Sequence, residues 1–256
     1  MGVPAKRIGM FALVLNCLVA SFAFAGPPFV TDDPETTDPR HWEIDFGSIY
    51  NHSQGSDFAQ APMLEVDYGL VEDVQLHAIF GTALQHDPGG DTHFGYGDTE
   101  LGVKYRFFHE TDALPQIGVF PLVEVPTGDP RRGLGNGKVQ VFVPLWAQKS
   151  FGKKVGAEGD DKEWKTMFGG GFWYNPAGRN YFLFGWELER YINEHLTLGA
   201  EIYHGTPNDI GAHGHTAFNV GGYFHFDEHN HILFSAGRDI DGPTTFNLYL
   251  AYQLTF

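Results

Sequence analysis

The final stretch of the chain, Thr244 to Phe256, constrains the fold more than any other. It reads TTFNLYLAYQLTF: every second residue counted back from the C-terminus is apolar, and the residues between are small or polar. Side chains of a β-strand alternate between two faces. About ten alternating residues are typical of a strand that crosses a bilayer, with one face in lipid and the other in a wet lumen. Strands of soluble sheets are usually shorter, about five or six residues. The stretch therefore predicts a strand of a transmembrane β-barrel.

The chain ends on an aromatic residue, Phe256, and the predicted strand runs to this last position. Such an end resembles the C-terminal signal of bacterial outer-membrane barrels. The resemblance implies that the barrel-assembly machinery reads Phe256 and that outer-membrane lipid surrounds the folded chain. We therefore expect export through the periplasm to the bacterial outer membrane.

Residues 1–25 have the three parts of a secretory signal peptide. Lys6 and Arg7 supply the positive region, residues 11–20 the apolar core, and residues 23–25 an A-x-A cleavage site. A transmembrane anchor is the alternative, but the apolar run is too short and ends in small residues. We therefore expect the signal to be removed.

Composition narrows the class of protein further. The only cysteine, Cys17, lies in the predicted signal, and Asn16 before it is not the small residue of a lipoprotein cleavage site. We therefore expect neither a lipid anchor nor a disulfide in the mature chain. The chain has 16 basic and 32 acidic residues and a formal net charge of −16. Nucleic acid is not an expected partner of so acidic a chain, and no motif indicates a cofactor.

Residues 26–41 form an irregular acidic segment with several prolines and no hydrophobic period. Two interpretations are open. The carboxylates could bind a divalent cation, or the segment could be a solvated tail, which we favour. The carboxylates are Asp32, Asp33, Glu35 and Asp38.

Residues 42–256 break into segments of about ten alternating residues separated by Gly, Asn, Asp and Pro clusters. This pattern predicts an all-β fold, a single antiparallel up-and-down barrel of about twelve strands. Pro121 and Pro144 fall within predicted strands, where we expect irregular pairing because proline lacks a donor. The faces of the segment 231–240 are ambiguous. The predicted strands are 42–50, 63–70, 75–84, 97–108, 116–125, 138–148, 162–174, 181–190, 195–204, 216–226, 231–240 and 244–256.

The connections between these strands predict an orientation. With the N-terminus in the periplasm, the connections on the outer side include most of the long loops, and those on the periplasmic side are tight except for 149–161. Short periplasmic turns and longer outer loops are usual in such barrels. The outer connections fall near 51–57, 85–96, 126–137, 175–180, 205–214 and 240–243.

Several sequence blocks resemble a known bacterial family, the proteins grouped under the label MetA pathway of phenol degradation. The similarity runs over most of the predicted barrel. It implies an outer-membrane barrel that passes small molecules, including aromatic ones, and it brings no agreed functional residues. The blocks are FGYGDTELGVKYRF (94–107), VPTGDP (125–130), FGWELER (184–190), LTLGAEIYH (196–204) and FDEHNHILFSAGR (226–238).

The inward positions predicted by alternation are rich in charge. Because an isolated buried ion is costly, these charges must be paired or hydrated. They could form a lattice of ion pairs that stiffens a narrow lumen, or a field that favours cations, as carboxylate rings do in cation pores. The predicted inward charges are Glu43, Asp45, Glu65, Asp67, Glu100, Glu124, Glu187, Glu189 and Glu201, against Lys104, Arg106 and Lys165.

Inward aromatic residues form a second predicted group. They could provide an apolar path for a hydrophobic solute or simply pack the lumen. They are Phe142, Trp146, Trp173, Tyr203, Tyr223 and Tyr249.

The histidines and serines of the sequence leave a metal site and an enzyme as other possible functions. His213 and His215 have a spacing that could chelate Zn²⁺ or Cu²⁺, but no third ligand accompanies them, so we predict no metal site. Ser53 follows His52, but no G-x-S-x-G motif is present, and adjacent residues alone do not make a catalytic dyad. We therefore predict a non-enzyme.

The function expected from these residues is passive passage of small solutes, including hydrophobic or aromatic ones, through a lumen biased toward cations or neutral molecules. A closed structural or surface-binding barrel and a barrel hydrolase are the alternatives.

Overall fold

The computed structural model describes residues 26–153, 163–243 and 245–256. Alternating residues of these ranges form β-strands, because one face of each strand is apolar and the other polar or small. The predicted signal peptide lies outside the described residues. The elements are β1 (Trp42–Ser53), β2 (Ser56–Val71), β3 (Val74–His86), β4 (Thr92–Tyr96), β5 (Thr99–Phe108), β6 (Gln116–Val119), β7 (Leu122–Val125), the short 3-10 helix η1 (Pro130–Arg132), β8 (Gln140–Phe151), β9 (Trp164–Tyr174), β10 (Tyr181–Asn193), β11 (Leu196–Gly205), β12 (His215–His225), β13 (Asn230–Asp241) and β14 (Phe246–Thr255).

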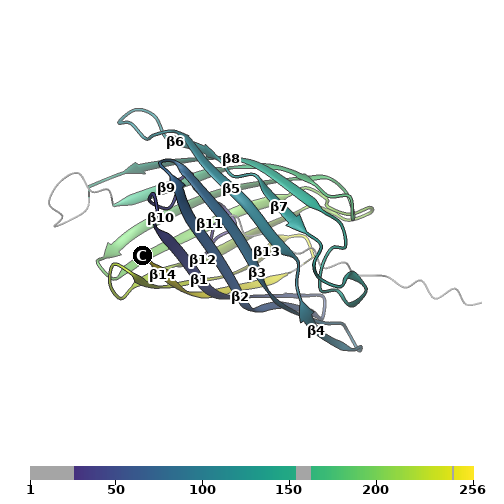
Figure 1. Ribbon diagram of the computed structural model, residues 1–256. Coiled ribbons are helices and arrows are strands. Elements are labelled where there is room, and N and C mark those ends of the chain that lie inside the picture. The colour runs from purple at the N-terminus through teal and green to yellow at the C-terminus, as the bar shows by residue number, and fades with distance from the viewer. Residues whose placement is uncertain (1–25, 154–162, 244) are drawn as a thin grey trace, which may run out of the picture.

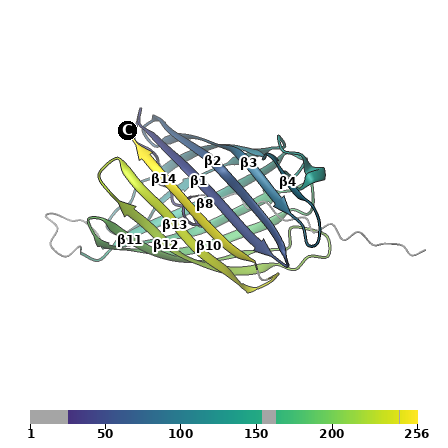
Figure 2. The same ribbon diagram turned by 90° about the horizontal axis from the view of Figure 1, so that it is seen from below.

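The strands form one closed antiparallel barrel (Figures 1 and 2). β4 and β5 share one place in the wall beside β3, and β6 and β7 share one place beside β8. The wall therefore has twelve positions, which confirms the predicted up-and-down barrel. β1 pairs with β14 to close it, and the backbones of Trp42 and Phe256 exchange hydrogen bonds of 2.7 and 3.0 Å at the end of this seam.

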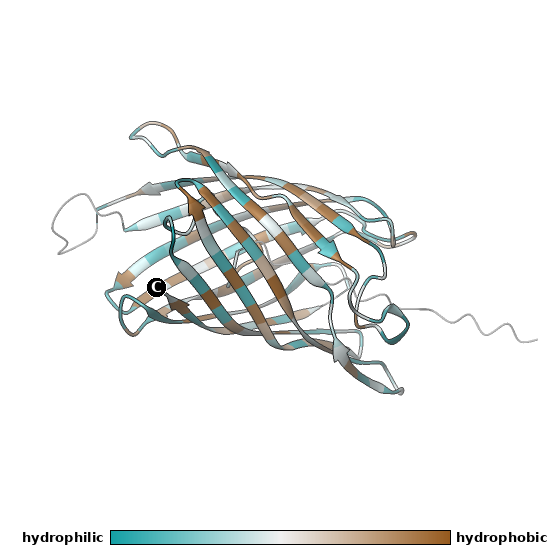
Figure 3. Ribbon diagram, in the orientation of Figure 1, coloured by the Kyte–Doolittle hydropathy of each residue, from teal (hydrophilic) through white to brown (hydrophobic). Residues whose placement is uncertain are grey.

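The wall alternates between an apolar outer face and an inner face with many polar side chains, seen as alternating colours along the strands in Figure 3. On β1, Phe46 is 54 % exposed on the outside, whereas its neighbour Asp45 is buried inside. Among the described residues, no helix is long and apolar enough to cross a membrane.

The two ends of the barrel differ. We call the end that carries Trp42 and Phe256 the terminal end and the opposite one the loop end. The turns 72–73, 194–195 and 226–229 at the terminal end are short, whereas the loop end carries the longer connections 126–139, 175–180 and 206–214. This division follows the expected grouping, except that the connection predicted near 51–57 is mostly strand. There β1 and β2 are joined by a tight turn at Gln54 and Gly55, both with positive φ.

The two strand prolines lie at the same interruption of the wall. Pro121 lies between β6 and β7 and interrupts the strand, as expected. Pro144 lies inside β8 and pairs regularly with Gly171 of β9. On its other side neither Val143 nor Pro144 is paired, because β6 ends and β7 begins there, so the expected irregular pairing occurs on one side of β8. A Cβ added at Gly171 would lie 2.4 Å from the Cα of Pro144. The absence of a side chain at Gly171 therefore allows the backbones of the two strands to approach closely. A register shift does occur in β2 between Gln60 and Met63, around Pro62.

Residues 26–37 of the acidic segment lie inside the barrel, and residues 38–41 are exposed. Phe29, Val30, Thr31 and Asp32 are all at most 3 % exposed. The expectation of a solvated tail was therefore wrong. The reason is physical: the backbone donors and carboxylates of the segment find hydrogen-bond partners on the inner wall, which replaces water as their surroundings.

Candidate functional site

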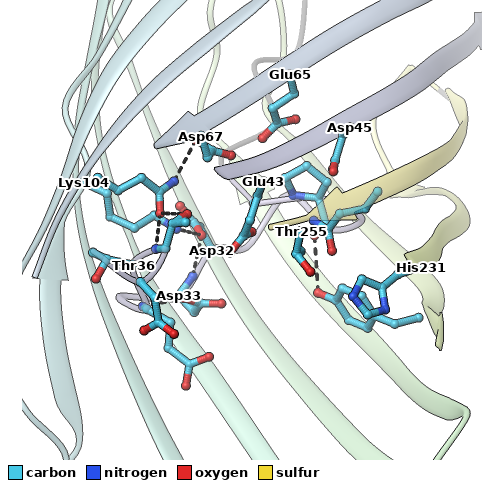
Figure 4. A pocket seen from close by; sticks show the side chains of 18 of the residues that line it. Asp32, Asp33, Thr36, Glu43, Asp45, Glu65, Asp67, Lys104, His231 and Thr255 are labelled. Atoms are coloured by element: carbon cyan, nitrogen blue, oxygen red, sulfur yellow. Dashed lines mark hydrogen bonds and ion pairs between the residues drawn. The ribbon is translucent and has the colours of Figure 1, made fainter. Parts of the chain in front are cut away.

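A cavity of about 1050 Å³ opens inside the terminal half of the barrel (Figure 4). Segment 26–41 forms part of its lining and the inner faces of the strands form the rest. Carboxylates of β1, β2 and β10 dominate its charge, and Lys104 of β5 and Lys165 of β9 are the amines that line it. The lining carboxylates of the strands are Glu43, Asp45, Glu65, Asp67, Glu187 and Glu189.

Glu201 of β11 holds the first part of the segment. Its carboxylate oxygens accept hydrogen bonds from the backbone N–H groups of Val30 at 2.8 Å and Thr31 at 2.7 Å. The side-chain amide of Asn219 donates to the same carboxylate at 2.6 Å. A buried carboxylate thus satisfies two backbone donors that have no strand partner.

Glu35 holds the middle of the segment. Its carboxylate accepts from Lys165 Nζ at 2.9 Å, from Gln148 Nε2 at 2.7 Å and from Gln116 Nε2 at 3.2 Å. These partners belong to three different strands, so one side chain of the segment links a large part of the wall.

Two further contacts fix the segment to β5 and β3. Lys104 Nζ donates to Asp32 Oδ1 at 2.9 Å and lies 4.9 Å from the centre of the Phe120 ring. The backbone N–H of Thr37 donates to Gln75 Oε1 at 2.8 Å. The segment is therefore held by hydrogen bonds and ion pairs around the lumen.

His77 of β3 lies at the centre of a buried group of carboxylates. Its Nδ1 is 2.8 Å from Asp67 Oδ1 and 3.7 Å from Glu65 Oε1, and its Nε2 is 3.1 Å from Glu100 Oε1. This histidine is not among the residues predicted to line the lumen. Strand alternation could have found it, because it shares the inward face of β3 with Gln75 and Ile79, both buried.

An aromatic layer fills the loop half of the lumen. The rings of Phe142 and Trp173 stack at 4.7 Å with an interplanar angle of 8°, and Tyr181 stacks on Trp173 at 5.8 Å. Trp146, Tyr203 and other inward side chains continue the same apolar cluster. The lumen thus carries a charged cavity in its terminal half and an aromatic layer in its loop half, where Glu124 and Asp239 are also buried.

Comparison with solved structures identifies the architecture. The chain is similar to a COG4313 outer-membrane channel from Pseudomonas putida F1, with a TM-score of 0.65 and 18 % identity over 88 % of this chain and 99 % of that one. It is also similar to the NanC porin, with a TM-score of 0.56, 8 % identity, and 82 % and 98 % of the two chains covered. The KdgM porin gives a TM-score of 0.55, 10 % identity, and 84 % and 99 % covered.

This chain has the fold of outer-membrane β-barrels. The likeness to the COG4313 outer-membrane channel agrees with the outer-membrane barrel fold that the resemblance of the sequence blocks implies. No protein-family model and no curated protein sequence matches the chain. At these identities the solved structures establish the fold of the barrel, and all three are described as channels or porins.

The barrel places the predicted lumen residues as follows. Glu43 and Lys165 are half-buried and line the cavity. Arg106 is half-buried near the terminal end, where its Nε donates to Asp73 Oδ1 at 2.8 Å. The remaining predicted residues are buried: Asp45, Glu65, Asp67, Glu100, Lys104, Glu124, Trp146, Trp173, Glu187, Glu189, Glu201, Tyr203 and Tyr249.

His213 and His215, whose spacing could chelate a metal, do not line the cavity. His213 is in the β11–β12 connection of the barrel, and the ring of His215 lies edge-on to Tyr203 at 5.9 Å. In the described part of the chain, three metal-ligand atoms come together elsewhere, at Glu65, Asp67 and His77.

Proposed function

We propose that this barrel is a passive outer-membrane channel for small solutes, including hydrophobic or aromatic ones. The observation that carries the proposal is the divided lumen: an aromatic layer follows a polar cavity along one axis. A solute with an apolar ring and a polar group would find a suitable surface in each half.

Segment 26–41 occupies the lumen, and a solute would pass only when the segment is displaced. It occupies the lumen through hydrogen bonds and ion pairs of its side chains and backbone, such as those of Glu201 and Glu35. A hydrogen bond to a charged group stabilises by about 1.5–3 kcal/mol, so individual contacts can be exchanged for water while the wall remains paired. Displacement of the segment would join the cavity to the aromatic layer.

We also propose that the lumen prefers cations or neutral molecules. Lys104 and Lys165 are neutralised by Asp32 and Glu35 of the segment. The carboxylates of β1, β2 and β10 then outnumber the remaining basic groups, and a ring of carboxylates favours cations.

A closed structural barrel is the second candidate, and the filled lumen favours it. A barrel hydrolase has less support. His52 pairs with Asp57 at 2.7 Å, but within the described residues no hydrogen bond joins it to Ser53.

Conductance in a planar bilayer under a salt gradient tests the proposal. The refolded protein should give stepwise conductance with a cation-selective reversal potential. Glu187→Gln should reduce the selectivity, whereas Glu194→Gln, whose side chain is 82 % exposed in a turn, should not. A folded barrel without conductance, and without uptake of an aromatic solute into vesicles, would exclude the channel and leave the closed barrel.

A further inference from the structure

Glu65, Asp67 and His77 form a compact group of potential metal ligands on neighbouring strands. Asp67 on β2 is directly paired with His77 on β3, and Glu65 lies two residues before Asp67 on the same inward face. One ligand atom from each residue lies within 4.8 Å of the other two. The strand register therefore fixes three donors at one place on the lumen wall.

The distances within the group suit a metal ion. Bonds of about 2.0–2.2 Å from a metal to imidazole nitrogen and carboxylate oxygen place neighbouring donors about 3–3.5 Å apart. The separations of 2.8 Å between His77 Nδ1 and Asp67 Oδ1, and 3.7 Å between His77 Nδ1 and Glu65 Oε1, lie on either side of that range. Small rotations of these side chains would bring all three donors to bonding distance.

The second ring nitrogen of His77, Nε2, contacts a carboxylate, as is usual for a metal-bound histidine. A metal-bound imidazole usually donates its other N–H to a carboxylate, which fixes the tautomer and the ring orientation. Here Glu100 Oε1 lies 3.1 Å from His77 Nε2. Phe120 lies edge-on to the same ring at 5.1 Å and restricts its rotation.

Glu65 provides an independent indication that a ligand is needed. The residue is 3 % exposed, and its Oε2 has no hydrogen-bond partner among the described residues. Asp45 Oδ1, on the neighbouring β1, is also buried without one. Both residues line the cavity and point toward it in Figure 4. An unpaired buried carboxylate oxygen is costly, and a cation would remove that cost.

We propose that Glu65, Asp67 and His77 bind a divalent transition-metal ion, with Glu100 as the hydrogen-bond acceptor that positions His77. One imidazole and two carboxylates are a donor set suited to Zn²⁺ and related ions. Three protein ligands leave a position open toward the cavity. The proposal does not depend on transport, because binding to a closed barrel would give the same result.

Metal titration of the refolded protein tests this site. After treatment with a chelator, the protein in detergent is titrated with Co²⁺, whose visible absorption reports its ligands, and with Zn²⁺ by calorimetry. We expect one saturable site per chain. His77→Gln and Glu65→Gln should abolish it, and Glu100→Gln should weaken it by about 10–100-fold.

His231→Gln is the matched control. His225 and His231 form a close pair of histidines, with their Nδ1 atoms 2.9 Å apart at the terminal end. Binding should survive His231→Gln. Loss of binding in His231→Gln with retention in His77→Gln would overturn the proposal, as would the absence of saturable binding at micromolar Co²⁺. That absence would indicate that a proton on His77, and not a metal, neutralises the carboxylates.

X-ray absorption of the Zn²⁺-loaded wild-type protein keeps the test decisive if a variant fails to fold. One imidazole with carboxylate oxygens supports the proposed site. Two imidazoles would assign the metal to His225 and His231 and overturn it.

Discussion

Lys104 on β5 donates a hydrogen bond of 2.9 Å to Asp32, a residue 72 positions earlier in the chain, and both side chains are buried within the barrel. The contact joins the wall to the segment that occupies the lumen. This ion pair is therefore one of the links between the stability of the barrel and the occupancy of its lumen.

Replacing Lys104 should destabilise the barrel strongly. Lys104→Met leaves Asp32 buried without its cation, and breaking a buried pair in this way costs about 3–5 kcal/mol. Urea unfolding followed by tryptophan fluorescence measures the change. Adding Asp32→Asn should restore much of the loss, and the exposed pair of Arg131 and Asp129 provides a control, since Arg131→Met should have no measurable effect. Additive effects of the two buried substitutions would contradict the coupling.

The docking of the segment should depend on Glu201. The described residues contain no cysteine, so Thr31→Cys introduces a single reporter at a position 1 % exposed. A charged maleimide should label it slowly. Glu201→Ala, which removes the acceptor of two backbone donors, should accelerate labelling at least tenfold, since one lost hydrogen bond to a charged group is worth about 1.5–3 kcal/mol. The exposed Glu194→Ala should leave the rate unchanged. Equal rates in all three proteins would show that Glu201 does not hold the segment.

Removing an inward tryptophan should open the aromatic half of the lumen. Trp173→Ala deletes the ring stacked on Phe142 and should raise the entry of an aromatic solute into vesicles, at a stability cost of about 3–5 kcal/mol. Trp186→Ala is the matched control, because Trp186 is 50 % exposed on the outer face. Faster entry with Trp186→Ala and not with Trp173→Ala would place the path outside the lumen.

The turn residue Asp73 should make stability depend on acid. Burial alone would raise the pKa of its carboxyl, but hydrogen bonds from Arg106 and His109 outweigh it and lower the pKa below the ordinary 3.8. A group with a lowered folded-state pKa stabilises above its unfolded-state pKa, and that stability is lost as the pH falls through the folded-state pKa. The difference in unfolding free energy between wild type and Asp73→Asn should be constant near neutral pH and shrink below about pH 4. A difference that grows on acidification would contradict this.

The C-terminal side chain should matter for assembly more than for the finished fold. Phe256 is 57 % exposed, and its bonds to Trp42 use only the backbone. We propose that the barrel-assembly machinery reads this ring. Phe256→Ser should therefore lower the yield of folded barrel in the outer membrane of an expressing cell while refolding in detergent stays normal. Phe226→Ser, at the same end and 55 % exposed, is the control. Equal yields from both variants would remove the special role of the terminal residue.

Alternation in the sequence predicts the wall well, because a strand with one lipid face and one inner face must alternate. Alternation does not assign the faces of a strand in which both sets of alternate residues contain apolar and polar side chains. In β13, Leu233, Ser235 and Asp239 are buried inside, whereas Arg238 is exposed outside near the loop end. Only the pairing of β13 with β12 and β14 fixes these faces, and pairing between distant strands is not local information.

The burial of residues 26–37 inside the lumen could not be predicted from the sequence, for a related reason. Residues 26–41 have no hydrophobic period, and their partners lie far along the chain: Gln75 is 38 positions from Thr37, and Lys165 is 130 positions from Glu35. A polar segment whose donors and acceptors are satisfied by a distant wall has the same local composition as a solvated one. Burial of this kind appears only when the barrel closes.

The enclosed segment sets the order in which this chain can fold. Closure brings together residues as distant as Asp45 and Tyr249, 204 positions apart, and contacts of such long range form slowly. Residues 26–41 continue directly into β1, one of the two strands of the closing seam. We expect them to lie along the inner faces when the seam forms, because their hydrogen-bond partners on the wall are then within reach of a chain end that is already tethered to β1. The barrel therefore assembles around its own N-terminal residues, and seam closure is the step at which they become enclosed.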